Sequence, residues 1–522
     1  MAQMRSRREQ VDAHRFITSR MNQALVIANP DSVERPLRRI GVSIFASVMI
    51  MVLIFGGFAI AALFNKGNDE PMANHIIFEK GTNAIYVYTT MSGREPTEED
   101  PLKLWPVANY TSALMLLQPY QGKPPTQSLK PESLEGKPRG FLVGIEGAPP
   151  SPPPVSSLLQ DELWNVCSMP IADGSSLLLA QVVVAKEEDL PAPEALADDW
   201  LFAETPEGTV YLLTNDRRYR IADEDFFNKL GLSENDVVTV KKELIDTVTP
   251  GPDLAFTPRT EFGEPSGIVV EGVDLKYGQT VVQGTDFYVL IEEGGAPVFA
   301  KISDMMRALM EPVTGFGQTI QINSTLLTEY GAQGQYETGD FPQTIDTDPR
   351  TVSGERPAVC TTFDPAAEAA DAHMTIGIYG SAPKLLTDEA RSITIDSEGT
   401  ILATGNPVAQ TVLPPGYAAL VSPQQQPGRT VASVMFLIHS QGYKYGIKDS
   451  GTAYGTTKSL LGYGEVEPVG VPESVLSLVQ AGPVLDPVEA RSELDPSGDT
   501  HRPFDSGEEE TESEEAGDAA GE

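Results

Sequence analysis

A single apolar run, Ile40–Phe64, dominates the organisation of this chain. Its 25 residues include no charged side chain, and a helix that crosses a bilayer needs only about 20 apolar residues. The run separates a head of 39 residues from a body of 458 residues. We therefore expect a single-pass membrane protein with nearly all of its mass on one side of the membrane.

The charges beside the run predict its orientation. The head carries eight arginines and four acidic residues, and Arg35, Arg38 and Arg39 lie next to the run. Positively charged flanks stay on the cytoplasmic side, so we expect a cytoplasmic N-terminus and an exported body. A cleaved signal peptide fits poorly, because its apolar segment is usually about 7–15 residues long, although Ala59–Ala61 resembles a cleavage site.

The body is strongly acidic and contains both cysteines. The chain has a net charge of −37, to which the head contributes about +4. This charge disfavours nucleic-acid binding, because nucleic-acid phosphates would be repelled. Cys167 and Cys360 lie in the exported part, where disulfides persist. A bridge between them is expected, with two free thiols or a redox pair as the alternative.

The body also contains an internal repeat. Residues 230–254 align without gaps on residues 461–485, with nine identical positions among 25. Both copies show apolar residues at helical spacing followed by Gly-Pro, which predicts a short buried helix and its end. A strand pair is predicted upstream of each copy, at 209–221 and 434–445. Weaker copies of the plan occur around residues 83–111 and 285–304.

These patterns predict an α+β fold with about four strand–strand–helix modules around a β-rich, barrel-like core and with pseudo-twofold symmetry. The expected segments are a head helix (1–39), a transmembrane helix (40–64), modules at 75–130, 201–260, 270–330 and 426–490, core β segments at 131–200 and 331–425, and a disordered acidic tail at 491–522.

The head is predicted to form an amphipathic helix from about Arg8 to Ala28. An amphipathic helix joined to a membrane span can lie on anionic lipid or dock on a partner protein, and the residues alone favour neither. The expected docking residues are Arg15, Phe16, Ile17, Met21 and Leu25.

Nine short motifs follow one another along the chain in an order that matches a known family. They are Val11–Phe16, Tyr86–Val87, Pro106–Ala113, Val143–Pro149, Leu163–Cys167, Pro357–Cys360, Gln441–Gly446, Lys458–Leu461 and Gly482–Leu485. In these motifs, in its short basic head, and in its single span and two cysteines, the chain resembles the EccB family. Proteins of this family are membrane-core components of the type VII (ESX) secretion systems of actinobacteria. This chain differs from the family at Ala13 and His14 and in its longer acidic tail.

The resemblance implies a hexameric inner-membrane machine in which an EccB-like protein assembles with EccC, EccD and EccE partners. EccC is the translocating ATPase of that machine. The resemblance also implies a periplasmic body with repeat modules around a central β core, and a disulfide that joins distant parts of this core. The cytoplasmic helix would contact partner subunits, and the modules would contact neighbouring copies.

ATPase activity has been suggested for this family, but the sequence contains no Gly-x-x-x-x-Gly-Lys-Ser/Thr phosphate loop. The nearest string, Gly451–Ser459, lacks the glycine before Lys458 and is interpreted as a turn with a helix N-cap. The five histidines show no metal-ligand spacing, and Asp346–Asp348 lacks the rest of a calcium loop. We expect no catalytic residue, cofactor or metal.

The sequence therefore predicts a structural subunit of a secretion complex in the inner membrane. One alternative is a membrane-anchored protein that binds cell wall or another ligand. Its aromatic face would include Tyr211, Tyr219, Tyr443 and Tyr445. An exported hydrolase is a second alternative, which we rank lower.

Overall fold

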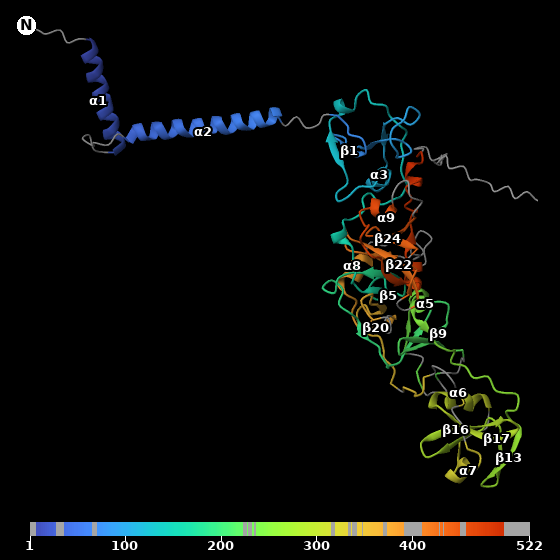
Figure 1. Cartoon of the computed structure of the whole chain (residues 1–522). Helices are drawn as coiled ribbons and strands as arrows, with labels where there is room; N and C mark the ends of the chain where they lie inside the picture. The colour runs from blue at the N-terminus through green and yellow to red at the C-terminus, as the bar shows by residue number, and fades with distance from the viewer. Residues whose placement is uncertain are drawn as a thin grey trace, which may run out of the picture. The chain divides into compact units, whose positions relative to one another are not determined.

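The computed structural model shows a mixed α+β protein with one long apolar N-terminal helix and a large β-rich body (Figure 1). Two compact units are distinguished: residues 1–71 with 129–135, and residues 72–128 with 136–522. The structure describes residues 7–27, 36–64, 70–222, 227, 232–233, 236–314, 319–331, 336, 342–346, 348–368, 373–390, 410–426, 429–431, 433–448 and 456–494.

The first unit consists mainly of two helices, α1 (Arg7–Ile27) and α2 (Pro36–Phe64). The head helix predicted from about Arg8 to Ala28 matches α1 to within one residue at each end. Helix α2 begins at Pro36, because proline is well suited to the first position of a helix, where its missing N–H is not needed. This helix therefore starts four residues before the predicted apolar run.

The core sheet of the second unit has six strands in the order β21-β6-β5-β19-β20-β7. Strands β5, β6 and β19 are buried along almost their whole length, because apolar clusters cover both faces of the sheet. In the part of the chain that the structure describes, the hydrogen-bonded path does not close on itself, so the core is an open sheet and not the barrel-like form predicted. Its elements are β5 (Trp164–Pro170), β6 (Leu178–Val184), β7 (Glu194–Ala195), β19 (Ala358–Phe363), β20 (Thr375–Tyr379), α8 (Lys384–Ala390) and β21 (Gln410–Val412).

The first and last sheets of the body share one hydrophobic core, which includes Ile76 and Val87 from the first sheet and Leu420 and Leu437 from the last. The first comprises β1 (His75–Glu79), β2 (Ile85–Thr89), β3 (Lys103–Pro106), β4 (Thr126–Leu129) and α3 (Tyr110–Leu116). The last comprises β22 (Ala418–Gln426), β23 (Arg429–Thr430), β24 (Met435–His439), β25 (Tyr443–Ile447), β26 (Val469–Pro472), β27 (Gln480–Ala481), α9 (Thr457–Leu460) and α10 (Glu473–Leu478). Its first strand thus begins at Ala418, earlier than the predicted boundary at residue 426.

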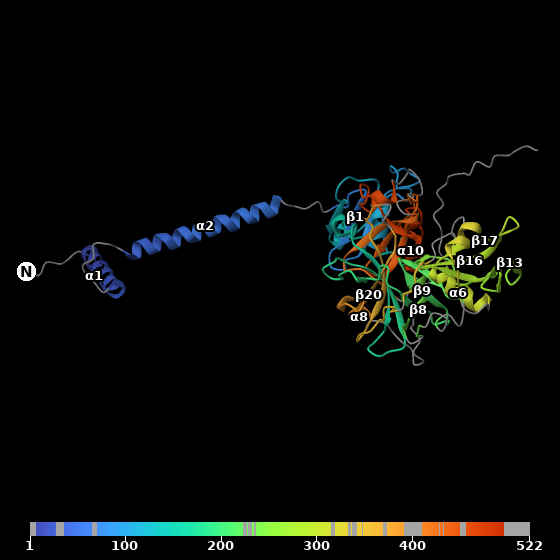
Figure 2. The same cartoon turned by 90° about the horizontal axis from the view of Figure 1, so that it is seen from below.

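Two further sheets lie between these in sequence. The second comprises β8 (Leu201–Glu204), β9 (Val210–Thr214), β10 (Arg217–Arg220), β11 (Val237–Thr239), α5 (Lys242–Thr247) and β12 (Thr249–Pro250). The third comprises β15 (Thr280–Gln283), β16 (Asp286–Glu293), β17 (Ala296–Ile302), α6 (Asp304–Thr314), β18 (Ile320–Gln321) and α7 (Ser324–Glu329), beside the hairpin of β13 (Pro265–Val270) and β14 (Val273–Lys276). Both views show β13, β16, β17 and α6 as one group (Figures 1 and 2).

The second and last sheets contain matching contacts. Strand β11 pairs in parallel with β8 as β26 does with β22, and β12 pairs with β10 as β27 does with β25. Gly251 and Gly482 donate their N–H groups to the neighbouring strand over 2.7 and 2.9 Å. A Cβ atom on either glycine would lie 2.3 or 2.5 Å from the ring of Tyr219 or Tyr445. The two glycines occupy aligned positions of the sequence repeat.

The C-terminal segment of the body returns to the first sheet. The Arg491 side chain is buried and donates hydrogen bonds to the carbonyl oxygens of Met115 and Leu116, each at 2.9 Å. The N–H of Leu494 donates to the carbonyl of Leu142 over 2.8 Å. The packed chain thus extends past the predicted start of the tail at residue 491, and residues 495–522 lie outside the described residues.

Candidate functional site

The apolar segment of α2 is the first candidate site. Residues Gly41–Ala59 have a mean hydropathy of 2.4, and none of them is buried within the structure. A helix that is apolar on every side is stable only in lipid or against other protein. The predicted ends, Ile40 and Phe64, both belong to α2, and their side chains lie outside the described part.

The head helix α1 presents an apolar stripe beside cations. Its large apolar side chains with a described surface are 49–82% exposed, and those four residues apart share one face. The guanidinium of Arg20 lies 5.7 Å from the centre of the Phe16 ring. The predicted docking residues Arg15, Phe16, Ile17, Met21 and Leu25 all lie on this helix. The arrangement can bind an apolar groove or a membrane surface.

The two cysteines form a disulfide, as predicted. Cys167 on β5 and Cys360 on β19 are directly opposite each other in the antiparallel pair, with Cα atoms 4.1 Å apart. Both side chains are fully buried. The bond joins residues 193 positions apart in the chain, so it connects strands from both halves of the body within the core sheet.

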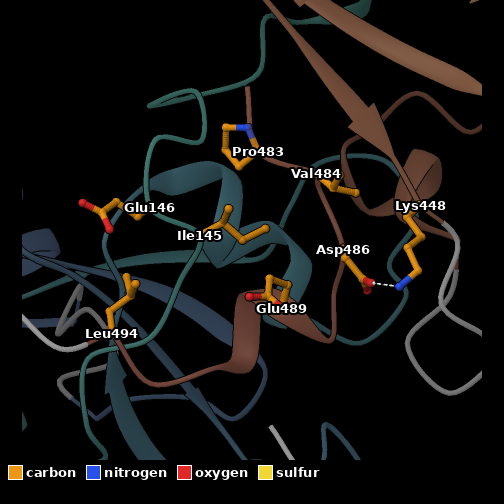
Figure 3. Close-up of a pocket in the computed structure, with 8 residues that line it drawn as sticks. All are labelled: Ile145, Glu146, Lys448, Pro483, Val484, Asp486, Glu489 and Leu494. Atoms are coloured by element: carbon orange, nitrogen blue, oxygen red, sulfur yellow. Dashed lines mark ion pairs between the residues drawn. The ribbon is translucent and has the colours of Figure 1, made fainter. Parts of the chain in front are cut away.

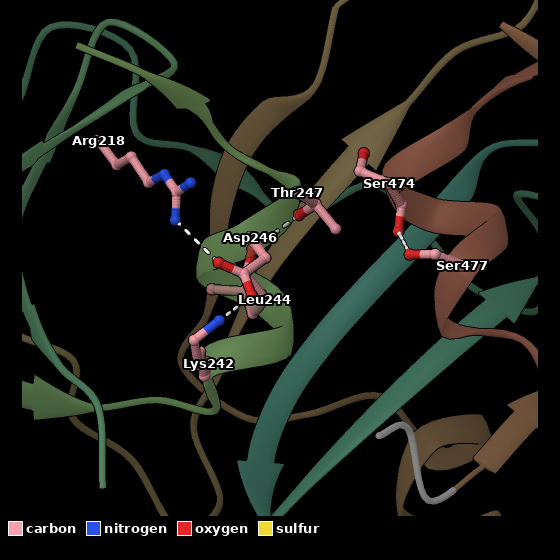
Figure 4. Close-up of polar contacts among 7 residues, drawn as sticks. All are labelled: Arg218, Lys242, Leu244, Asp246, Thr247, Ser474 and Ser477. Carbon is pink, nitrogen blue, oxygen red and sulfur yellow. Dashed lines mark hydrogen bonds and ion pairs between the residues drawn. The ribbon is translucent and has the colours of Figure 1, made fainter. Parts of the chain in front are cut away.

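Helix α5 lies against the core sheet and beside α10 (Figure 4). The Asp246 carboxylate on α5 accepts hydrogen bonds from Arg218, at 3.0 Å, and from Lys242. The hydrogen bond to Asp246 raises the pKa of Lys242. On the other side of the helix, the hydroxyl groups of Thr247 and Thr361 lie 2.7 Å apart, which ties α5 to β19. These contacts fix the second sheet on the core.

A different cation occupies the corresponding place in the last sheet. The Lys444 ammonium donates to the carbonyl oxygen of Leu476, near the end of α10, and burial lowers the pKa of Lys444. It lies 5.6 Å from the Phe436 ring centre, as Arg218 lies 5.9 Å from that of Tyr211. The carbonyl end of a helix has partial negative charge, which Lys444 complements in α10, whereas Arg218 is paired with the Asp246 side chain of α5.

No group of three or more His, Cys, Asp or Glu residues within the described residues could hold a metal ion. In the string that resembles a phosphate loop, residues 451–455 lie outside the described part. Its remainder forms the start of α9, where the Thr456 hydroxyl accepts the Ser459 N–H and the Thr457 hydroxyl donates to the carbonyl of Lys448. The predicted N-cap is thus present at Thr456, and the turn predicted before it falls on residues outside the described part.

The four tyrosines proposed for a ligand-binding face do not form one. Tyr219 and Tyr445 are buried, each against its glycine. Tyr211 and Tyr443 are half-buried. Two other features, the buried Arg491 and a pocket beside Lys448, were not predicted from the sequence. Neither has a local motif, since each depends on contacts between the two ends of the body.

Comparisons with known proteins identify the same family that the order of the motifs indicated. The family model for EccB, described as type VII secretion system ESX-1, transport TM domain B, matches residues 3–497. The "ESX-3 secretion system ATPase EccB3" of Mycolicibacterium smegmatis is 24% identical, over 92% of this chain and 89% of that protein. The "ESX-1 secretion system ATPase EccB1" of Mycobacterium tuberculosis is also 24% identical, over 91% of this chain and 92% of that protein.

Solved structures share the fold. An intact ESX-5 inner membrane complex contains a chain with a TM-score of 0.60 and 19% identity, over 95% of this chain and 97% of that one. An EccB3 dimer from the ESX-3 core complex gives a TM-score of 0.56 and 22% identity, over 80% and 99%. Because the family model matches nearly the whole chain, this protein belongs to the EccB family, the B component of the membrane complexes of type VII secretion systems.

Proposed function

We propose that this chain is a scaffold subunit of an ESX inner-membrane complex and that it acts through its surfaces. One observation carries the proposal: a single candidate span in α2 joins a head helix with exposed apolar residues to a large body held by a buried disulfide. Such a chain can connect partners on the two sides of a membrane. Similar solved structures are those of an inner membrane complex and of a dimer, which supports assembly as its role.

We infer that the head is cytoplasmic and the body periplasmic. Arg35, Arg38 and Arg39 precede the apolar segment, and such residues favour the cytoplasmic side. The disulfide between Cys167 and Cys360 is favoured in an oxidising compartment. A reporter enzyme that is active only in the periplasm, fused after residue 494, should be active. The same reporter fused before Arg7 should be inactive.

The expected partners are EccC-, EccD- and EccE-type subunits, with further copies of this chain contacting one another through the body. The matching contacts of Gly251 and Gly482 with Tyr219 and Tyr445 support our proposal that the second and last sheets are copies of one repeat module. Pseudo-twofold symmetry of the body follows from that proposal. We propose further that the first and third sheets are more distant copies.

We propose that the chain is not an enzyme, although its relatives have the word ATPase in their names. The N–H of Ser459, which a phosphate loop would direct at a phosphate, is bonded to Thr456. Purified full-length protein should hydrolyse ATP no faster than its Lys458→Ala variant. A large loss of hydrolysis in that variant would contradict the proposal.

Extraction of the tagged protein in mild detergent tests the scaffold role. We expect it to co-purify with an FtsK-like ATPase and other membrane subunits. Ile17→Glu combined with Met21→Glu should release the cytoplasmic partners, because each change places a charge on the apolar stripe. Ser19→Glu with Asn22→Glu, which adds the same charge to the opposite face of α1, is the matched control. Recovery of wild type only as a monomer, with secretion unimpaired after gene deletion, would refute the role.

A further inference from the structure

A pocket of about 480 Å³ lies where the first and last sheets of the body meet (Figure 3). Ile145 and Glu146 come from the loop after the first sheet, and the other lining residues come from the end of β25 and the C-terminal segment. The side chain of Ile145 is buried, whereas Val484 is half exposed. The pocket thus offers an apolar surface that solvent can reach.

Charged groups surround this apolar surface unequally. Three carboxylates, Glu146, Asp486 and Glu489, and one cation, Lys448, line the pocket, and of the carboxylates Asp486 pairs with Lys448 (Figure 3). The Asp486 side chain is only 8% exposed and lies 2.9 Å from the Lys448 ammonium, which is on a side chain 65% exposed. A buried carboxylate is therefore paired with a lysine whose side chain remains largely in solvent.

The fold of the module does not require this ion pair. The aligned sheet has the same parallel bridge, Ile221 with Leu254, as the last sheet has between Ile447 and Leu485. The residue after each bridged position is Lys448 and Asp486 in the last sheet, but alanine in both places in the second sheet. Since the second sheet forms the same parallel bridge with alanine in both places, the bridge itself does not depend on the charged pair.

We propose that this pocket binds a lysine or arginine side chain on an extended segment of a partner polypeptide, and that Lys448 occupies the place of that cation until the partner arrives. The aliphatic part of the incoming side chain would lie on Ile145 and Val484. Its charged end would replace the Lys448 ammonium at Asp486 and approach Glu146 and Glu489. The acidic charge of the body would attract such a segment.

A titration of the full-length protein in neutral detergent with the peptide acetyl-Ala-Lys-Ala-amide tests the inference. The same peptide with norleucine in place of lysine has no charged side chain and should bind much more weakly. Lys448→Met should strengthen binding of the lysine peptide about two- to fivefold, because the competing cation is gone. Glu146→Gln with Glu489→Gln should weaken it about three- to tenfold, as expected for two partly exposed ion pairs. All three side chains can be replaced without touching the hydrogen bond from the Val488 N–H to Asp486.

The control removes the same charge elsewhere: Glu292→Gln with Glu293→Gln, at the exposed end of β16 in the third sheet, should leave binding unchanged. Equal binding of the two peptides, or equal weakening by the control, would overturn the proposal. So would a Lys448→Met protein that binds no more tightly than wild type. If n-butylamine binds as well as the peptide, a polypeptide occupant is excluded. Co-purification with other subunits tests the scaffold role separately, so that role can hold even when peptide binding fails.

Discussion

Replacing Arg491 by methionine is expected to loosen the joint between the two ends of the body. This arginine is 1% exposed and donates three hydrogen bonds of 2.9 Å, to the carbonyl oxygens of Met115, Leu116 and Pro487. Met115 and Leu116 belong to the last turn of α3, where carbonyl groups have no partner within the helix. The arginine therefore supplies hydrogen-bond donors that these buried groups otherwise lack.

The size of the effect follows from the number of bonds. A hydrogen bond from a charged group contributes about 1.5–3 kcal/mol, but burial of the guanidinium offsets part of that gain. Removing one member of such a buried charged network usually costs about 3–5 kcal/mol. Methionine fills much of the volume and leaves the carbonyls unsatisfied, so we expect about 3 kcal/mol. Alanine should cost more because it also opens a cavity.

Hydrogen exchange measured by mass spectrometry can localise this loss. A change of about 3 kcal/mol corresponds to roughly 150-fold faster exchange in peptides that cover α3. Peptides from β15 to β17 have a separate core and should be unaffected. The reasoning is refuted if Arg491→Met is folded and α3 exchanges at the wild-type rate.

Three further predictions concern stability. Cys167→Ser with Cys360→Ser should destabilise the body by up to ~5 kcal/mol, because the bridge closes a loop of nearly two hundred residues; a melting temperature that reduction does not change would contradict this. Gly251→Ala and Gly482→Ala should each lower the free energy of unfolding in urea by about 1–3 kcal/mol, because the new methyl group would overlap a tyrosine ring. Gly446→Ala is the control, because its methyl group would meet only contacts of 3.6 Å or more. Burial lowers the pKa of His439 in the folded protein. As the pH falls below about 6.5, the unfolded chain therefore binds a proton on this histidine before the folded protein does, and the free energy of unfolding decreases. The free energy of unfolding of His439→Gln should depend less on pH between 7 and 5 than that of the wild type.

Features that depend on neighbouring residues were predictable from the sequence. The strand pair expected at 285–302 is β16 with β17, and that expected at 434–445 is β24 with β25. Alternating β-branched and aromatic residues around a short turn specify such pairs locally. The helix at Asn109 was predictable for the same reason, because the Asn109 side chain accepts the Ser112 N–H as a cap.

The candidate site was only partly predictable. The apolar segment and the head helix depend on composition and spacing within one continuous stretch, so the sequence identified both. Pairing of Cys167 with Cys360 followed from there being two cysteines, both in a body that we expect to be exported. The pocket at Lys448 has no such signal, because Glu146 and Asp486 become neighbours only when the first and last sheets pack together.

The sequence alone identified the candidate membrane span, its charge asymmetry, the internal repeat and the family, because each depends on local composition or on the order of short motifs. The tertiary structure decided that the core sheet is open, that the first and last sheets share one core, and that Arg491 joins them. These features depend on contacts between residues such as Met115 and Arg491, which are 376 positions apart. A local pattern cannot encode which distant surface will cover an apolar face, because many pairings would bury a similar area, and only the packed chain selects one.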